Sequence, residues 1–173
     1  MLTRDSAALV VVDVQEAFRG YDAFADVAAA SAKLVRAARI LGVPTVATEQ
    51  YPKGLGRSAP ELGLLEDVAV VEKSVFSAAR AEGFSLQGRP QAVLCGIEAH
   101  VCVAQTALDL LEQEVEVYLP VDAVGSRFGR DAEVAIRRLE TAGAVVTTVE
   151  AVLFELLERA GTPEFKAIQE LVK

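Results

Sequence analysis

Short apolar segments alternate with segments of helical periodicity along the chain, and this alternation restricts the fold more than any other feature. Apolar runs rich in β-branched residues lie at residues 7–12, 43–48, 67–72, 91–95, 115–120 and 144–149. Helical apolar spacing is found at residues 25–41, 101–113, 130–142, 152–159 and 163–172. Buried strands that alternate with helices predict a parallel sheet covered on both faces. We therefore expect a three-layer α/β fold.

The length of the chain and the spacing of these segments predict one domain over residues 1–173. A chain of this size buries roughly two-thirds of the surface that its unfolded form exposes, which is enough for one core. Residues 49–63 contain several prolines and glycines without periodicity, and they are predicted to form a long loop.

The net charge and the apolar content exclude some classes of binding partner. A formal net charge of -8 would repel both nucleic acid and anionic membranes. No apolar stretch approaches the roughly 20 residues that cross a bilayer. The apolar fraction of 52% predicts either a deeply buried sheet or a homo-oligomer that covers one face of each subunit. A small molecule is therefore the expected ligand.

The cysteine content and the N-terminal sequence both bear on the cellular compartment. Two cysteines, Cys95 and Cys102, are too few for the disulfide framework of a small secreted protein. The first residues, MLTRDSAALVVVDVQ, place acidic residues around the apolar run and contain no small-residue cleavage site. We therefore expect a reduced, cytoplasmic protein.

Polar residues follow the predicted strands at their carboxyl ends. In parallel α/β sheets the ligand crevice lies beyond these ends, at the point where the strand order reverses. Asp13 and Gln15 follow the first strand, Lys73 follows the third, and residues 96–102 follow the fourth. An acid, a lysine and a cysteine are therefore expected at one crevice.

Cys102 follows a strand and a glycine, and it is predicted to lie at the start of a helix. A cysteine in an α/β domain is commonly a small core side chain, and Cys95, inside a strand, is interpreted in that way. At a helix start, however, free amides and the positive end of the helix stabilise a thiolate. We therefore interpret Cys102 as a candidate nucleophile.

Asp13 and Lys73 are the candidate partners of this thiol. One interpretation makes Asp13 a cap and Lys73 a solvated strand end. The other makes Asp13 the general base for Cys102, and Lys73 the cation that keeps the thiolate and the carboxylate ionised. The joint placement of the three residues at one crevice favours the second interpretation.

His100 is the only histidine and lies two residues before Cys102. Side chains two residues apart diverge around a helix start, so a role in lining the pocket or capping the turn is favoured over direct base catalysis. One histidine without clustered ligands gives no support for a zinc or iron site, and the sequence contains no phosphate-binding loop. The sequence therefore predicts no metal and no cofactor.

Three aromatic residues, Phe18, Tyr51 and Phe76, lie just past the predicted strand ends. Aromatic side chains are more often part of a core than of a substrate pocket. Their position beside the crevice favours the pocket here. We expect these three aromatic residues, together with Gln15 and His100, to contact the substrate.

Six blocks of sequence in a fixed order resemble the isochorismatase-like cysteine hydrolase superfamily. They read VVVDVQEAF, TEQYPKGLG, VEKSVFSA, CGIEAHVCV, DAVGSR and AGAVVTTVEAVLFELL. The resemblance covers nearly the whole chain and is greatest to the branch of isochorismatase-domain-containing proteins. It implies a six-stranded parallel sheet in the order 3-2-1-4-5-6, with the switch point between the strands that end at Asp13 and Gly96.

The resemblance also implies the roles of individual residues. The Asp-Lys-Cys triad of the family corresponds to Asp13, Lys73 and Cys102, and its cis peptide bond corresponds to Ile97-Glu98. The backbone amides of Glu98 and Cys102 would then form an oxyanion hole. Nicotinamidases of the superfamily bind a metal through an Asp-x-His pair and a further histidine, whereas TEQYPKGLG contains no histidine. Metal-dependent nicotinamide hydrolysis is therefore not expected. The resemblance also implies a homo-oligomer, expected as a dimer or tetramer.

These residues predict the hydrolysis of a small amide through a thioester on Cys102. A second possibility is cleavage of a vinyl ether of the isochorismate type, which some relatives perform with the aspartate and lysine and without the thiol. A third is a non-catalytic interaction protein that keeps the fold. Released ammonia would distinguish the first from the second, and a lack of both activity and thiol labelling would favour the third.

Overall fold

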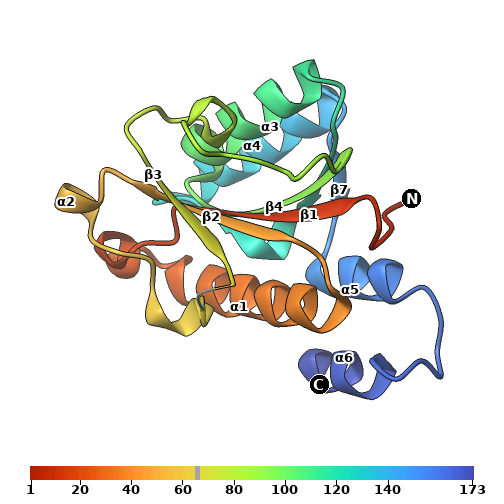
Figure 1. The fold of residues 1–173 in the computed structure, drawn as a ribbon. Helices are drawn as coiled ribbons and strands as arrows, with labels where there is room; N and C mark the ends of the chain where they lie inside the picture. Colours follow the sequence, from red (N-terminus) through yellow and green to blue (C-terminus); the bar gives the residue numbers. More distant parts are fainter. Residues whose placement is uncertain (65–66) are drawn as a thin grey trace.

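A parallel sheet lies between two layers of helices (Figure 1). This computed structural model describes residues 1–64 and 67–173. The strands within them are β1 (Ala7–Val12), β2 (Thr45–Gln50), β3 (Ala69–Lys73), β4 (Gln91–Ile97), β5 (Glu116–Pro120), β6 (Val124–Gly125) and β7 (Val145–Thr147). Their order is β3-β2-β1-β4-β5-β7, with β6 paired to β4 outside this path. The strand order therefore reverses between β1 and β4.

Helices cover both faces of this sheet. In Figure 1, α1 (Phe24–Leu41), α5 (Val149–Leu157) and α6 (Phe165–Val172) lie below the sheet, and α3 (Ala104–Glu112) and α4 (Gly129–Thr141) lie above it. The short α2 (Pro52–Leu55) follows β2. Short 3-10 turns at Glu16–Gly20, Pro60–Leu62, Ala78–Arg80 and Val121–Ala123 connect these elements. Within residues 1–64 and 67–173, no helix is both long and apolar enough to cross a membrane.

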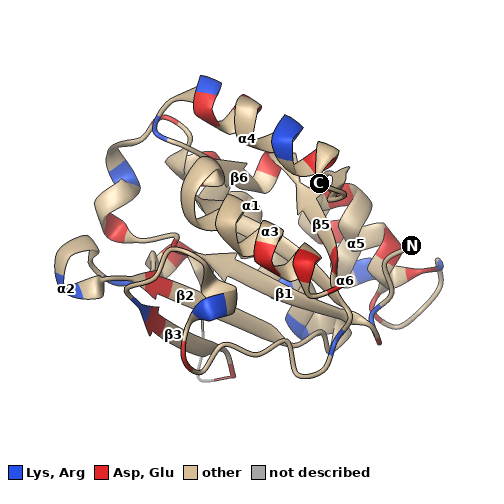
Figure 2. Ribbon diagram, turned by 90° about the horizontal axis from the view of Figure 1, so that it is seen from above, with Lys and Arg blue, Asp and Glu red and all other residues tan. Residues whose placement is uncertain are grey.

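The sequence of β1 explains its place near the centre of the sheet. All six of its residues, AALVVV, are buried, and alternate side chains enter the cores on opposite faces. Leu9 and Val11 pack in the core that contains residues of α1, whereas Val10 and Val12 pack with residues of α3. Figure 2 shows β1 free of charged residues, while charges mark the helices and the ends of β2 and β3.

The expected fold class and strand order are confirmed, with one correction to the strand count. The sheet has seven strands instead of six because residues 124–125 pair with Gly96 and Ile97. A two-residue strand is too short to produce a periodic signal. The final strand is also shorter than expected, because Thr148 already caps α5 through its side chain.

Two other predicted segments differ from the structure. The expected loop at residues 49–63 contains the last residues of β2, the helix α2 and a 3-10 turn. The expected helix at residues 101–113 begins as a π-helical turn, Ala99–Val103, before α3 continues it to Glu112. Periodicity misses both features because they are single turns.

Gly96 allows the close approach of β4 to β1 at the point where the strand order reverses. Its φ is 126°, a conformation that side chains rarely adopt. A Cβ atom added there would lie 1.9 Å from the carbonyl oxygen of Val12. Any side chain at this position would therefore force the two strands apart beside the crevice.

Substitution of Gly96 by alanine should lower the free energy of unfolding by more than about 3 kcal/mol, because both the backbone conformation and the contact with Val12 become unfavourable. Gly20→Ala is the matched control, since a Cβ there meets no atom within 4 Å, and it should change the free energy by less than about 0.5 kcal/mol. Urea unfolding followed by circular dichroism measures both. Equal midpoints for the two variants would contradict this role of Gly96.

Candidate active site

Asp13 comes directly after β1 and lies at the crevice. Its φ of 50° is in the left-handed region, which aspartate adopts more readily than most residues. Oδ1 accepts a 2.6 Å hydrogen bond from the hydroxyl of Thr48, whose backbone pairs with Val12 in the sheet. Oδ2 lies 2.7 Å from Lys73 Nζ, and both charged side chains are fully buried. The structure therefore brings the predicted acid and lysine together as a buried ion pair.

Lys73 is the last residue of β3, and its side chain passes the end of β2 to reach Asp13. Its ammonium group also donates to Gln50 Oε1 at 2.7 Å, and to the carbonyl oxygens of Phe76 at 3.0 Å and Val75 at 3.3 Å. All three protons of the ammonium group therefore have acceptors. Full hydrogen bonding makes a buried charge compatible with the folded state.

Two glutamines support this ion pair. The amide nitrogen of Gln50 donates to the carbonyl oxygen of Ser74 at 2.9 Å, while its oxygen accepts from Lys73. Gln15 accepts from the backbone N–H of Gln50 at 2.7 Å and donates to the carbonyl oxygens of Gln50 and Gly56. Both amide protons of Gln15 are therefore used within the protein, although the sequence suggested Gln15 as a substrate contact.

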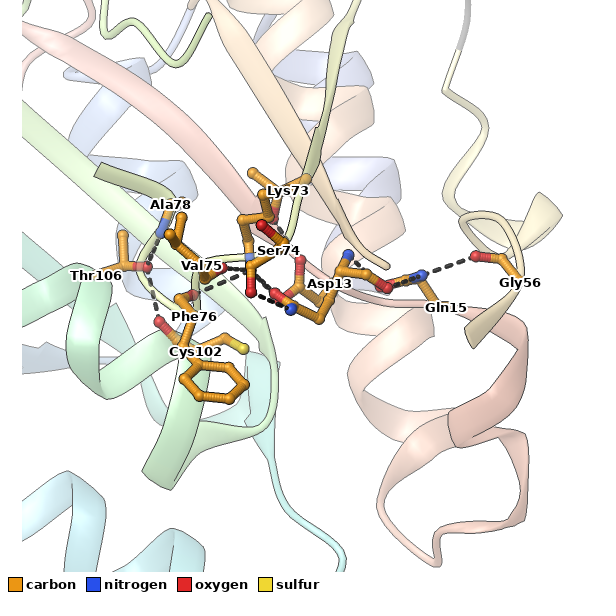
Figure 3. A network of polar contacts seen from close by, with 12 residues as sticks. Asp13, Gln15, Gly56, Lys73, Ser74, Val75, Phe76, Ala78, Cys102 and Thr106 are labelled. Carbon is orange, nitrogen blue, oxygen red and sulfur yellow. Dashed lines mark hydrogen bonds and ion pairs between the residues drawn. The ribbon is translucent and has the colours of Figure 1, made fainter. Parts of the chain in front are cut away.

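Cys102 lies in the π-helical turn that connects β4 to α3. Figure 3 draws it with the polar network that contains Asp13 and Lys73. The residue is 6% exposed. The predicted nucleophile therefore lies at the same end of the sheet as the ion pair, with its side chain largely removed from water.

Burial and a neighbouring carboxylate both act against the ionised form of the Cys102 thiol. Burial raises its pKa to about 12, and the negative charge of Asp13 acts in the same direction. Lys73 lowers the pKa but does not compensate for these two effects. The expected stabilisation of a thiolate by the helix start is therefore opposed here by burial and by the charge of Asp13.

Cys95 is a core side chain, as predicted. It is fully buried within β4, and its sulfur contacts the carbonyl oxygen of Val10 at 3.7 Å. Burial raises the pKa of this thiol to about 12 as well. Unlike Cys102, it packs in the core that contains residues of α1, away from the polar network.

The peptide bond between Ile97 and Glu98 is cis, as the resemblance implies. The Glu98 carboxylate accepts a 3.3 Å hydrogen bond from the backbone N–H of Arg127, so this side chain is directed toward the segment after β6. The backbone N–H of Glu98 has no hydrogen-bond partner among the described residues. This amide is therefore free to donate to a ligand.

His100 is engaged with groups that do not belong to the triad. Its Nδ1 lies 3.0 Å from the hydroxyl oxygen of Ser126, and its Nε2 lies 4.0 Å from the Asp131 carboxylate in α4. The histidine therefore links the π-helical turn to the segment after β6. These contacts agree with the preference for a turn-capping or lining role over a role as the base for Cys102.

The three predicted aromatic contacts differ in exposure. Phe18 is partly buried and packs against the core, with its ring centroid 5.3 Å from that of Tyr21. Tyr51 and Phe76 are 58% and 52% exposed; Tyr51 directly follows β2, and Phe76 is the third residue after β3. Tyr51 and Lys73 also border one shallow depression at the surface. Tyr51 and Phe76 are therefore available to a ligand, while Phe18 supports the loop after β1.

The family model described as the isochorismatase domain matches residues 7–151, which contain Asp13, Lys73 and Cys102. The chain belongs to the isochorismatase family.

Relatives of known sequence or structure support this assignment. Isochorismatase domain-containing protein 2 of Bos taurus is 43% identical over 171 residues, which cover 97% of this chain and 83% of that protein. A structure described as MAR1 ribonuclease from Caenorhabditis elegans has a TM-score of 0.92 at 41% identity, and the match covers 99% of this chain and 91% of that chain. The Escherichia coli YcaC gene product, described as an octameric hydrolase of unknown specificity, has a TM-score of 0.84 at 26% identity, with 91% and 82% covered.

In this isochorismatase-family chain, a buried carboxylate holds the segment after β2. Glu49 accepts hydrogen bonds from the backbone N–H and the hydroxyl of Ser58 at 2.6 and 2.8 Å, and from the Arg57 guanidinium at 2.9 Å. Burial opposes ionisation, but these hydrogen bonds outweigh it and lower the pKa of Glu49. The described residues contain no group of three His, Cys, Asp or Glu side chains that could hold a metal ion.

The residues that hold the ion pair were not predicted as site residues from the sequence. Thr48 and Gln50 bind Asp13 and Lys73, yet neither was selected as a site residue. A signal was present, because β2 ends in the polar triplet TEQ although these residues are buried. Polar side chains at a buried strand end need hydrogen-bond partners, and the crevice supplies them.

The raised pKa of Cys102 predicts how its alkylation by iodoacetamide depends on pH. Only the thiolate reacts, so the rate should increase about tenfold per pH unit from about pH 7 to about pH 10 without a plateau. Mass spectrometry of the labelled peptide measures this rate. Cys102→Ala is the control, because the remaining Cys95 is fully buried and should not react in the folded protein. A plateau near neutral pH would show a resting thiolate and contradict a raised pKa of Cys102.

Proposed function

We propose that this protein is a cysteine hydrolase that cleaves the C–N bond of a small amide through a thioester on Cys102. The observation that carries this proposal is the buried ion pair of Asp13 and Lys73 beside the buried Cys102 thiol, whose pKa is raised by burial. A thiol with a raised pKa needs a base at the moment of attack. The Asp13 carboxylate lies close enough for its charge to act on that thiol, and it can meet this need.

The proton on the thiol follows a simple path in this mechanism. Asp13 accepts the proton from Cys102 while the sulfur attacks the carbonyl carbon of the amide. Protonated Asp13 then donates the same proton to the nitrogen of the leaving group, so that ammonia or an amine departs and the thioester remains. Asp13 next removes a proton from water, which attacks the thioester and releases the acid and the thiol. Lys73 balances the charge of Asp13 in every state in which the carboxylate is ionised.

The negative oxygen of each tetrahedral intermediate needs hydrogen-bond donors. Glu98 directly precedes the turn that carries the nucleophile and Cys102 lies within it, and the Glu98 amide has no partner among the described residues. Preorganised backbone amides stabilise developing charge without reorganisation during the reaction. We therefore assign these two amides to the oxyanion hole.

Exposed residues near the strand ends suggest where the substrate is recognised. Tyr51 and Phe76 present aromatic surface, and His100 lies on the same turn as Cys102. Aromatic faces with a few polar groups suit a small organic amide. Gln15 contributes indirectly, because it holds Gln50 and Gly56 in place. The proposed reaction requires no cofactor.

The description of the Caenorhabditis elegans relative as a ribonuclease raises RNA as an alternative substrate. A net charge of -8 opposes the binding of a phosphate backbone. Cleavage at a ribose also commonly uses a pair of acid–base groups, whereas the only histidine contacts Ser126 and Asp131 here. These features favour a small molecule over RNA.

Self-association as a dimer or tetramer and a cytoplasmic location stay predictions.

Substitution of Cys102 by alanine should reduce the release of ammonia by at least about a thousandfold, because no other group can form the thioester. A panel of small amides with enzymatic detection of ammonia measures the rate. Cys95→Ala is the matched control, since it also removes one buried thiol, and it should retain most of the activity of the folded protein.

Two results would contradict the proposed function. One is equal activity of Cys102→Ala and the unmodified protein, as expected for cleavage of a vinyl ether without the thiol. The other is the absence of turnover on every amide while RNA is cleaved in a manner that depends on Asp13. Analysis of the products for ammonia, pyruvate and shortened RNA distinguishes these chemistries.

A further inference from the structure

Thr106 connects the nucleophile's turn to the segment that follows β3. Its hydroxyl donates a 2.7 Å hydrogen bond to the carbonyl oxygen of Cys102 and accepts a 2.8 Å hydrogen bond from the backbone N–H of Ala78. Thr106 and Ala78 are both fully buried. A hydroxyl has one proton, and Ala78 can only donate, so the direction of both hydrogen bonds is fixed.

The segment held by Thr106 is the same segment that holds Lys73. The carbonyl oxygens of Val75 and Phe76 accept from the Lys73 ammonium group, and Ala78 follows two residues later. Figure 3 shows this chain of contacts from Cys102 through Thr106 and Ala78 to Phe76 and Lys73. One hydroxyl therefore joins the backbone of the nucleophile to the backbone that positions its cation.

We infer that Thr106 is a positioning residue, which sets the distance between the Cys102 thiol and the Lys73 ammonium group. This inference rests on the proposed function for its catalytic meaning, although the geometry itself does not depend on the substrate. Without the hydroxyl, the buried Ala78 N–H would lose the one hydrogen bond that it makes to the described residues. The segment must then move to find another acceptor, and the two carbonyl oxygens that hold Lys73 move with it.

A second contact allows this role to be distinguished from simple support of the fold. Arg80 and Asp109 form two 2.6 Å hydrogen bonds between the same segment and the next turn of α3. Among the described residues, neither side chain is hydrogen-bonded to Cys102, Lys73 or Thr106. Loss of this ion pair therefore loosens the segment from α3 without removing the link through Thr106.

The test compares Thr106→Val, Thr106→Ser and Arg80→Gln by the rate at which iodoacetamide alkylates Cys102 in the folded protein. Thr106→Val keeps the shape but removes the hydroxyl, so Lys73 should withdraw from the thiol and the pKa of Cys102 should increase. One unit of pKa corresponds to alkylation that is about tenfold slower at a fixed pH below that pKa. Thr106→Ser restores the hydroxyl and should react within about threefold of the unmodified protein. The alkylation rate of Arg80→Gln should also lie within about threefold of that of the unmodified protein, even if this variant unfolds at a lower urea concentration.

The inference is overturned if Cys102 of Thr106→Val is alkylated as fast as Cys102 of the unmodified protein, or faster. It is also overturned if Thr106→Val and Arg80→Gln slow the alkylation of Cys102 by the same factor. If Thr106→Val does not fold, Thr106→Ala replaces it and should also slow the reaction, because a water molecule that satisfies the Ala78 N–H is not covalently part of α3, as the threonine side chain is. Alkylation needs no amide substrate. A failure of the proposed hydrolysis therefore appears separately, as ammonia release that is absent from all variants. Where hydrolysis is present, Thr106→Val should lower kcat by about tenfold to a hundredfold with a smaller change in KM.

Discussion

Asp13 and Lys73 carry opposite charges on fully buried side chains, and the surrounding structure depends on keeping both charges paired. The removal of each ion from water costs several kcal/mol, so a buried pair is compatible with folding only when its remaining hydrogen-bonding groups have partners. Thr48 and Gln50 supply side-chain partners, and the segment after β3 supplies backbone carbonyl oxygens. The pair can therefore form only when β1, β2 and β3 are in register.

The same environment determines the state of the nucleophile. A thiolate would add a second negative charge beside Asp13, so burial and this charge together raise the pKa of the Cys102 thiol. Under the proposed mechanism, the thiolate exists only while Asp13 holds the proton. A protonated thiol reacts slowly with oxidants and stray electrophiles, because the thiolate is the reactive form. The site is thus protected in its resting state, and a bound substrate has to supply the carbonyl carbon that makes proton transfer productive.

Much of this fold and part of this site could be predicted from the sequence, for identifiable reasons. The strand order and layers followed from apolar periodicity and family resemblance, and Asp13, Lys73 and Cys102 stood out because they follow strands. The resting state of Cys102 could not be predicted, because it depends on burial by residues distant in the sequence. Thr48, Gln50 and Thr106 were missed because their importance comes from hydrogen bonds between elements that periodicity does not describe.

The central claim is that Cys102 becomes acylated during turnover, with Asp13 as the base for its thiol. Mass spectrometry of the protein, quenched with acid during the first turnover of an amide that releases ammonia, tests this claim most directly. The account predicts a mass increase equal to the acyl part of the amide on the peptide that contains Cys102, none on Cys95, and none at all in Asp13→Asn. Steady release of ammonia without an acyl group on Cys102 would contradict it.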